Sequence, residues 1–187
     1  MRISTDLIYV VSGLPRSGTS LMMQILETAG IKNHTDNIRI PDESNPKGYA
    51  EYEAVKSLMK SNAFMKEAKG KSLKIVTPLI PFIDTTLNYK VVVMNRSVDE
   101  VLDSQQVMLG KEKGAASPVL KAAFEKQSIS AKSFLDKFQI PYIEIDHKKL
   151  IQNPELELLK LNDFLALNGS IEQLVQCVDP NLYRQRK

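Results

Sequence analysis

The feature that most constrains the fold of this chain is a glycine-rich turn near its N-terminus. Residues 10–21 read Val-Val-Ser-Gly-Leu-Pro-Arg-Ser-Gly-Thr-Ser-Leu. The apolar run at residues 7–11 predicts a buried strand before the turn, and the apolar spacing of residues 21–29 predicts a helix after it. A strand, a tight loop and a helix in this order direct the loop amides and the positive end of the helix at one point, where they bind an anion.

The loop has the spacing of a phosphate-binding loop, with one departure. Gly13, Gly18 and Ser20 stand at the positions that such a loop requires. Nucleotide-hydrolysing enzymes carry a lysine where this chain has Thr19. The positive charge within the loop is instead Arg16, three residues earlier. We therefore expect the loop to hold a phosphate, but not the β- and γ-phosphates of ATP.

Size and composition are those of one soluble domain, which we assign to residues 1–187. The chain is 43% apolar and 25% charged, with a formal net charge of +3. Cys177 is its single cysteine, which excludes an intrachain disulfide and fits a reducing compartment. No basic tract is interleaved with aromatic residues, no run approaches about 18 apolar residues, and no segment resembles a signal peptide. We expect a cytoplasmic protein that binds neither nucleic acid nor membrane; the oligomeric state stays open.

Predicted strands and helices alternate along the chain. We expect strands at residues 7–12, 73–76, 90–94 and 141–145, and helices at residues 19–29, 51–68, 79–87, 98–109, 118–138, 153–167 and 171–178. Ser97 and Glu100 predict a capping box at the start of the helix at 98–109. This alternation predicts an α/β fold, specifically a three-layer P-loop-like fold with a parallel sheet of about four to five strands and helices on both faces. Ligands in such folds bind at the carboxyl ends of the strands.

A second candidate site follows the buried strand at residues 90–94. ATP-using enzymes with this kind of loop end a neighbouring strand in an aspartate that holds magnesium. This strand is followed instead by Arg96, whose planar guanidinium suits a phosphate. The alternative for Arg96 is an ion pair with a surface carboxylate such as Asp99. Ser104, about two helical turns further on, is either a second donor to the same anion or a solvated helix serine.

These residues resemble the sulfotransferase family. Residues 14–20, Leu-Pro-Arg-Ser-Gly-Thr-Ser, resemble its 5′-phosphosulfate loop, and Arg96 with Ser104 resembles its 3′-phosphate site. Residues 45–51, Asn-Pro-Lys-Gly-Tyr-Ala-Glu, resemble an Asn-Pro-x-Gly-Tyr-x-Glu signature of many small bacterial members. Because residues 179–183 also resemble the end of the family's sequence, the resemblance runs in order along nearly the whole chain.

The resemblance implies a PAPS-dependent sulfotransferase, in which 3′-phosphoadenosine-5′-phosphosulfate (PAPS) is the co-substrate and no metal takes part. The sulfuryl group passes to a hydroxyl or amine on an acceptor, which is a small molecule, a saccharide or a peptide. A sulfuryl group carries less negative charge than a terminal phosphoryl group, so the missing lysine and metal-binding aspartate are accounted for. Fixed donors of the loop then stabilise charge on the bridging oxygen. The donor-binding residues implied are Arg16, Ser17, Gly18, Thr19, Ser20, Arg96, Ser104 and Tyr183.

The general base is the least determined part of the site. Animal cytosolic sulfotransferases use a histidine in a Lys-x-His-x-Pro segment, and the comparable stretch at residues 74–78 has valine in its place. We take Arg16, Glu51 and Lys74 as the candidate catalytic residues, with Glu51 as the base because it belongs to the signature. The alternatives are a surface lysine for Lys74 and a helix N-terminal acid for Glu51. His34 and His147 are each either a base or a bystander.

Two other functions stay open. A small P-loop kinase would use Glu144 and Asp146, at the end of the last strand, to hold magnesium, although Thr19 argues against it. A binding module would keep the anion pocket without turnover, in agreement with the missing histidine.

Overall fold

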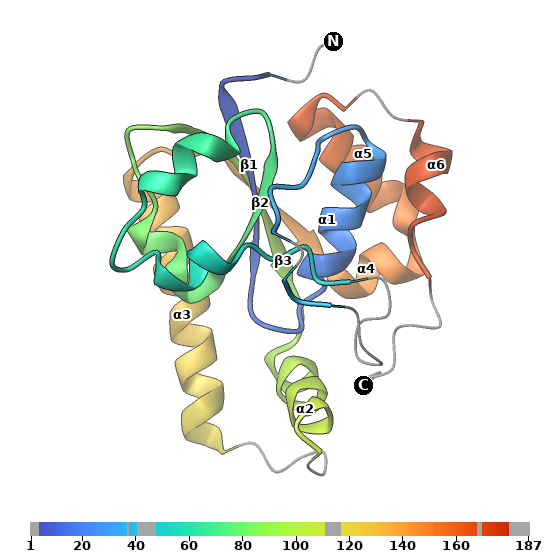
Figure 1. Cartoon of the computed structure of the whole chain (residues 1–187). Helices are drawn as coiled ribbons and strands as arrows, with labels where there is room; N and C mark the ends of the chain where they lie inside the picture. The colour runs from blue at the N-terminus through green and yellow to red at the C-terminus, as the bar shows by residue number, and fades with distance from the viewer. Residues whose placement is uncertain (1–3, 37, 41–47, 111–116, 168–169, 180–187) are drawn as a thin grey trace.

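A parallel sheet forms the centre of the computed structural model (Figure 1), which describes residues 4–36, 38–40, 48–110, 117–167 and 170–179. Its strands stand in the order β2 (Ser72–Val76), β1 (Leu7–Gly13), β3 (Asn88–Asn95) and β4 (Tyr142–Asp146). Gly13, the last residue of β1, pairs with Val76 and with Met94, so β1, β2 and β3 end at one edge of the sheet. This arrangement confirms the predicted α/β class and parallel sheet.

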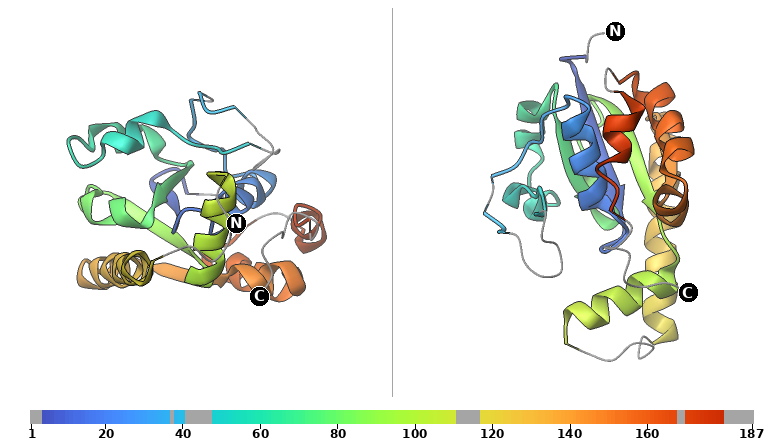
Figure 2. Two further views of the ribbon diagram at one scale, coloured as in Figure 1. Left: turned by 90° about the horizontal axis from the view of Figure 1, so that it is seen from below. Right: turned by 90° about the vertical axis from the view of Figure 1, so that its right-hand side faces the viewer.

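Helical segments cover both faces of the sheet (Figure 2). One face carries α1 (Thr19–Thr28), α4 (His147–Gln152), α5 (Pro154–Leu165) and α6 (Ile171–Val175). The other carries α3 (Pro118–Lys137) and the 3-10 helices η1 (Glu53–Ser57), η2 (Ala63–Ala68) and η3 (Thr77–Phe82). α2 (Val98–Met108) and the N-terminal half of α3 extend past the carboxyl edge of the sheet (Figure 1).

The burial of the central strands explains their apolar sequences. In β1, Tyr9 and Val11 face the helices around α1, whereas Ile8 and Val10 face α3. Because both faces are covered, the strand reads as a continuous apolar run instead of an alternating one. Residues 91–94 of β3 are buried in the same way. Because successive side chains of a strand point to opposite faces, each polar side chain at the carboxyl edge points either toward the α1 layer or toward the α3 layer.

Two predicted helices are wrong in type. The segment at 51–68 forms two short 3-10 helices, η1 and η2, because a turn at residues 58–60 and the polar, irregular residues 61–62 separate them. In the segment at 79–87, residues 79–82 belong to the 3-10 helix η3, in which Pro78 and Pro81 lack the backbone N–H groups that an α-helix needs, and residues 83–87 are not helical. The helix α4 was not predicted. Within the described residues, no helix is both long enough and apolar enough to span a bilayer.

Candidate functional site

The glycine-rich loop lies between β1 and α1 at the carboxyl edge of the sheet, as predicted. Gly18 has a φ of 95°, a left-handed conformation that favours glycine. A Cβ at Gly18 would lie 2.4 Å from Cδ2 of His147, and one at Gly13 would lie 2.3 Å from Oγ of Ser17. Arg16 is also left-handed, with a φ of 69°. The loop is therefore a tightly packed turn that leads directly into the N-terminus of α1.

The loop and the Arg96–Ser104 pair form one cluster. The guanidinium of Arg96 donates an Nη1–H bond to the carbonyl oxygen of Arg16 at 2.9 Å. The Nε–H of Arg16 donates to the hydroxyl of Ser104 at 3.2 Å. Arg16 is thus in direct contact with Arg96 and Ser104, which follow it by 80 and 88 positions in the chain. Arg16 and Arg96 thus lie next to each other at the carboxyl edge of the sheet.

A buried ion pair orients Arg96. Its Nε–H donates to Oε2 of Glu100 at 2.9 Å, and only 7% and 4% of the two side chains are exposed. Glu100 therefore does not complete the predicted capping box, and the side chain of Ser97 makes no capping hydrogen bond. Asp99, the suggested partner of Arg96, instead pairs with Lys121 at 2.9 Å. The i,i+4 spacing of Arg96 and Glu100 was the sequence signal for this pair.

Lys74 approaches the loop from the α1 side of the sheet. Its ammonium donates to the hydroxyl of Ser20 at 3.2 Å, to the carbonyl oxygen of Tyr49 at 2.9 Å and to Oε1 of Glu51 at 3.1 Å. Only 7% of the side chain is exposed, so the reading of Lys74 as a surface lysine is wrong. Burial lowers the pKa of Lys74 against the opposing effect of the Glu51 carboxylate. A neighbouring strand thus supplies a lysine close to the start of α1.

Glu51 is held between two cations. Besides Lys74, it accepts two hydrogen bonds from Nη1 of Arg39, at 3.0 and 3.1 Å. The Arg39 guanidinium in turn stacks on the ring of Tyr49, 3.4 Å from its centroid. Burial alone would raise the pKa of Glu51, but Lys74 and Arg39 outweigh it and the pKa lies below its ordinary value. A carboxylate in this environment is a poor proton acceptor. No sequence pattern pointed to Arg39.

The two histidines occupy different places. His147 is the first residue of α4, is buried, and packs against Gly18. Burial, with a smaller effect of Arg96, lowers the pKa of His147 to about 4, so its imidazole is neutral at pH 7. His34 lies near Ser72, at the start of β2 and thus away from the loop, and its ring contacts that of Tyr52 in a tilted arrangement with the centroids 4.4 Å apart. Burial also lowers the pKa of His34.

Some predicted site residues lie outside the described residues, namely Tyr183 and residues 45–47 of the signature. In the described ranges, no group of three or more histidine, cysteine, aspartate and glutamate side chains is arranged to hold a metal ion. Glu144 accepts hydrogen bonds from Asn95 and Lys132, and Asp146 caps α4 by accepting from the Lys149 amide at 2.9 Å. Both carboxylates suggested for magnesium therefore have structural roles.

Comparison with known proteins gives structural matches alone. No model of a known protein family matches the chain, and no curated protein matches its sequence. Among solved structures, it is similar to the sulfotransferase domain of the Synechococcus PCC 7002 olefin synthase, with 12% identity and a TM-score of 0.55 over 100% of this chain and 90% of that chain. It is also similar to the sulfotransferase STF1 of Mycobacterium tuberculosis H37Rv, with 15% identity and a TM-score of 0.56 over 94% of this chain and 71% of that chain. The chain therefore has the fold of the sulfotransferase domains, as the resemblance of its motifs predicts.

Proposed function

We propose that this protein is a sulfotransferase that moves a sulfuryl group from PAPS to an acceptor. The observation that carries the proposal is the contact of the glycine-rich loop at residues 13–20, here called the anion loop, with Arg96 and Ser104 through Arg16. A ligand that uses the loop and both arginines needs anionic groups at two points, as in an adenosine with a 5′-phosphosulfate and a 3′-phosphate. The sulfotransferase fold of the chain supports the same conclusion.

The donor would lie along the carboxyl edge of the sheet. The 5′-phosphosulfate would be bound by the loop amides and the N-terminus of α1, through Arg16, Ser17, Gly18, Thr19 and Ser20. Arg96 and Ser104 would bind the 3′-phosphate, and the Ser104 hydroxyl, which accepts from Nε of Arg16, can donate its own proton to a phosphate oxygen at the same time. Tyr183 is proposed as a further donor-binding residue on the resemblance alone.

The proposed reaction needs positive charge where the leaving group develops negative charge. The acceptor oxygen forms a bond to sulfur, while the bond between sulfur and the bridging oxygen of the phosphosulfate breaks and adenosine-3′,5′-bisphosphate leaves. The acceptor proton passes to solvent. Lys74 and Arg16 would stabilise the oxygen that leaves, because both are bonded into the loop region before the ligand arrives. Since Glu51 is a poor proton acceptor, we assign it the role of holding Lys74 in place.

Nucleotide-induced stabilisation tests the proposal. Adenosine-3′,5′-bisphosphate at a hundredfold excess over its Kd should stabilise the protein by about 2.7 kcal/mol, which raises Tm by roughly 5–10 °C with or without magnesium. Incubation with PAPS and an acceptor panel should then release the bisphosphate. Stabilisation by ATP and magnesium without stabilisation by the bisphosphate would contradict the proposal in favour of a kinase. Bisphosphate binding without turnover over the panel would indicate a binding module.

A further inference from the structure

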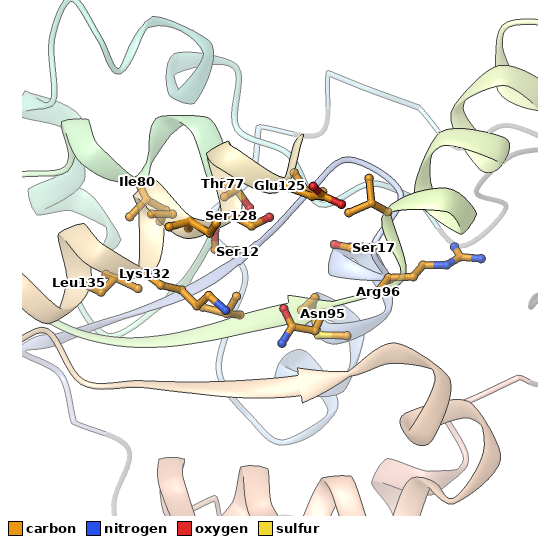
Figure 3. A pocket seen from close by; sticks show the side chains of 16 residues that line it. Ser12, Ser17, Thr77, Ile80, Asn95, Arg96, Glu125, Ser128, Lys132 and Leu135 are labelled. Carbon is orange, nitrogen blue, oxygen red and sulfur yellow. The ribbon is translucent and has the colours of Figure 1, made fainter. Parts of the chain in front are cut away.

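A cavity of about 360 Å³ lies beside the anion loop, on the α3 face of the sheet (Figure 3). Its floor is formed by the ends of β1 and β3, its wall by α3, and its two ends by η3 and the loop. The labelled side chains in Figure 3 come from all of these elements, and the guanidinium of Arg96 is turned away from the cavity toward α2. The volume is at the small end of the roughly 300–1,000 Å³ range of ligand pockets.

Two buried hydroxyl groups line this cavity, one from the end of β1 and one from the loop. The side-chain oxygens of Ser12 and Ser17 are buried, and neither has a hydrogen-bond partner among the described residues. Each residue is only 1% exposed. A buried hydroxyl without a partner costs about 1–3 kcal/mol, so such groups in native proteins call for an explanation. A ligand that supplies a hydroxyl group here would give both serines a partner.

The charge around the cavity favours a neutral ligand. Its interior is lined by Leu14, Ile80, Val93 and Leu135, which are all buried. At the rim, the charge of Lys132 is balanced by Glu144, which lies 3.4 Å from the ammonium and also accepts a hydrogen bond from Asn95. Glu125, the acidic residue of the lining, is exposed. A charged ligand would therefore lose its hydration in the interior without meeting a buried counter-charge.

We propose that this cavity is the acceptor pocket and that the acceptor is a compact, neutral and mainly apolar alcohol or phenol. This inference rests on the proposed sulfotransferase function. Ser17 belongs both to the anion loop and to the cavity, so a hydroxyl bound beside it is next to the phosphosulfate. The cavity lies on the α3 face, whereas Lys74 approaches the loop from the α1 face. The acceptor oxygen thus reaches sulfur from one side while the leaving oxygen is stabilised from the other.

The chemistry of the pocket distinguishes hydroxyl acceptors from amines. In the transfer step, the oxygen of the alcohol forms the new bond to sulfur, the bridging S–O bond of PAPS breaks, and the hydroxyl proton passes to solvent. An aliphatic amine is a cation at pH 7 and must lose a proton before it enters the apolar interior. A carboxylate-bearing acceptor must likewise lose its charge, by gaining a proton, before it enters the apolar interior. Cyclohexanol and benzyl alcohol should therefore bind, and cyclohexylamine and benzoate should not.

Binding measurements with matched variants of α3 test this inference. Ser128 lines the cavity, and a leucine there would fill part of it, whereas Ser130 is exposed on the same helix outside the lining. With the bisphosphate bound, Ser128→Leu should weaken the binding of benzyl alcohol at least tenfold, measured by NMR titration, and Ser130→Leu should leave it unchanged. Ser12→Val should remove the preference for benzyl alcohol over toluene. Neither α3 variant should alter the Tm shift produced by the bisphosphate.

The outcomes separate this inference from the proposed function. If the bisphosphate binds and benzyl alcohol does not, or if Ser128→Leu and Ser130→Leu behave alike, the acceptor pocket is refuted and the proposed function stands. If the bisphosphate itself does not bind, the proposed function fails. Should Ser128→Leu not fold, the amide resonances of Ser12, Val93 and Ala131 in the unchanged protein provide the test. They should shift on addition of benzyl alcohol, and constant resonances would refute the pocket.

Discussion

Arg96 donates a hydrogen bond to the backbone carbonyl oxygen of Arg16, 80 residues earlier, at 2.9 Å. The bond ties the end of β3 to the anion loop that follows β1. Because the acceptor is a backbone atom of a left-handed residue, Arg96 stabilises the loop conformation itself. A phosphate bound to Arg96 would therefore also affect the loop, so the two anion sites are expected to be coupled.

Replacement of Arg96 should destabilise the fold as well as weaken nucleotide binding. In Arg96→Ala, the buried Glu100 carboxylate loses its ion pair with Arg96, which costs up to about 3–5 kcal/mol in the free energy of unfolding. The double variant Arg96→Met with Glu100→Leu should recover most of this stability in urea denaturation. It should not recover the Tm shift produced by adenosine-3′,5′-bisphosphate. Recovery of that shift would remove Arg96 from the donor site.

Substitution of Gly18 should show how tightly the loop packs on His147. Gly18→Ala combines a left-handed φ with a Cβ 2.4 Å from the imidazole, and we expect a loss of more than about 2 kcal/mol in the free energy of unfolding. Gly110→Ala is the control, because its φ is 69° but nothing lies within 4 Å of the added Cβ. It should lose about 1 kcal/mol. Adding His147→Ala to Gly18→Ala should restore part of the stability that Gly18→Ala loses in excess of Gly110→Ala. If none is restored, the excess loss does not come from the contact between the added Cβ and the imidazole.

Stability should fall in acid because of His147. Its pKa lies at about 4 in the folded protein and near 6.5 in the unfolded chain, so the unfolded state binds a proton first as the pH decreases. The free energy of unfolding should therefore decrease between pH 6.5 and pH 4, by up to about 3 kcal/mol from this group. Urea denaturation across this range should show a weaker pH dependence for His147→Gln. His34→Gln measures the separate contribution of the other histidine. If the free energy of unfolding depends on pH in the same way for His147→Gln and for the unchanged protein, the assignment of this pH dependence to His147 is refuted.

Loss of Lys74 should affect turnover more than product binding. If Lys74 stabilises the leaving oxygen, Lys74→Met should lower kcat for sulfuryl transfer by about 10²–10³-fold, with a smaller change in the Kd of the bisphosphate. Lys69→Met is the control, since Lys69 is exposed and pairs with Asp6 at the opposite edge of the sheet. Equal losses in kcat and in bisphosphate affinity for Lys74→Met would instead assign Lys74 to ground-state binding.

Local sequence patterns were enough to predict the sheet and the loop. The apolar runs at residues 7–11 and 90–94 can be accommodated only in strands covered on both faces, and the loop spacing is a property of adjacent residues. Parallel strands joined by helices bring their carboxyl ends to one edge. It followed that Arg96 would lie near the loop, and the 2.9 Å bond to Arg16 confirms this placement.

Contacts between distant segments were decided by the tertiary structure alone. The pairing of Lys74 with Glu51 and Arg39 depends on how the segment before η1 folds over β2, which no local periodicity encodes. The cavity beside Ser17 depends on the distance between α3 and the sheet, which is set by the side chains of several elements together. Backbone propensities act over a few residues, whereas the burial of a charge or the size of a cavity is determined by packing of the whole molecule. The sequence by itself thus determined where the glycine-rich loop and Arg96 lie, and the tertiary structure decided which side chains surround them.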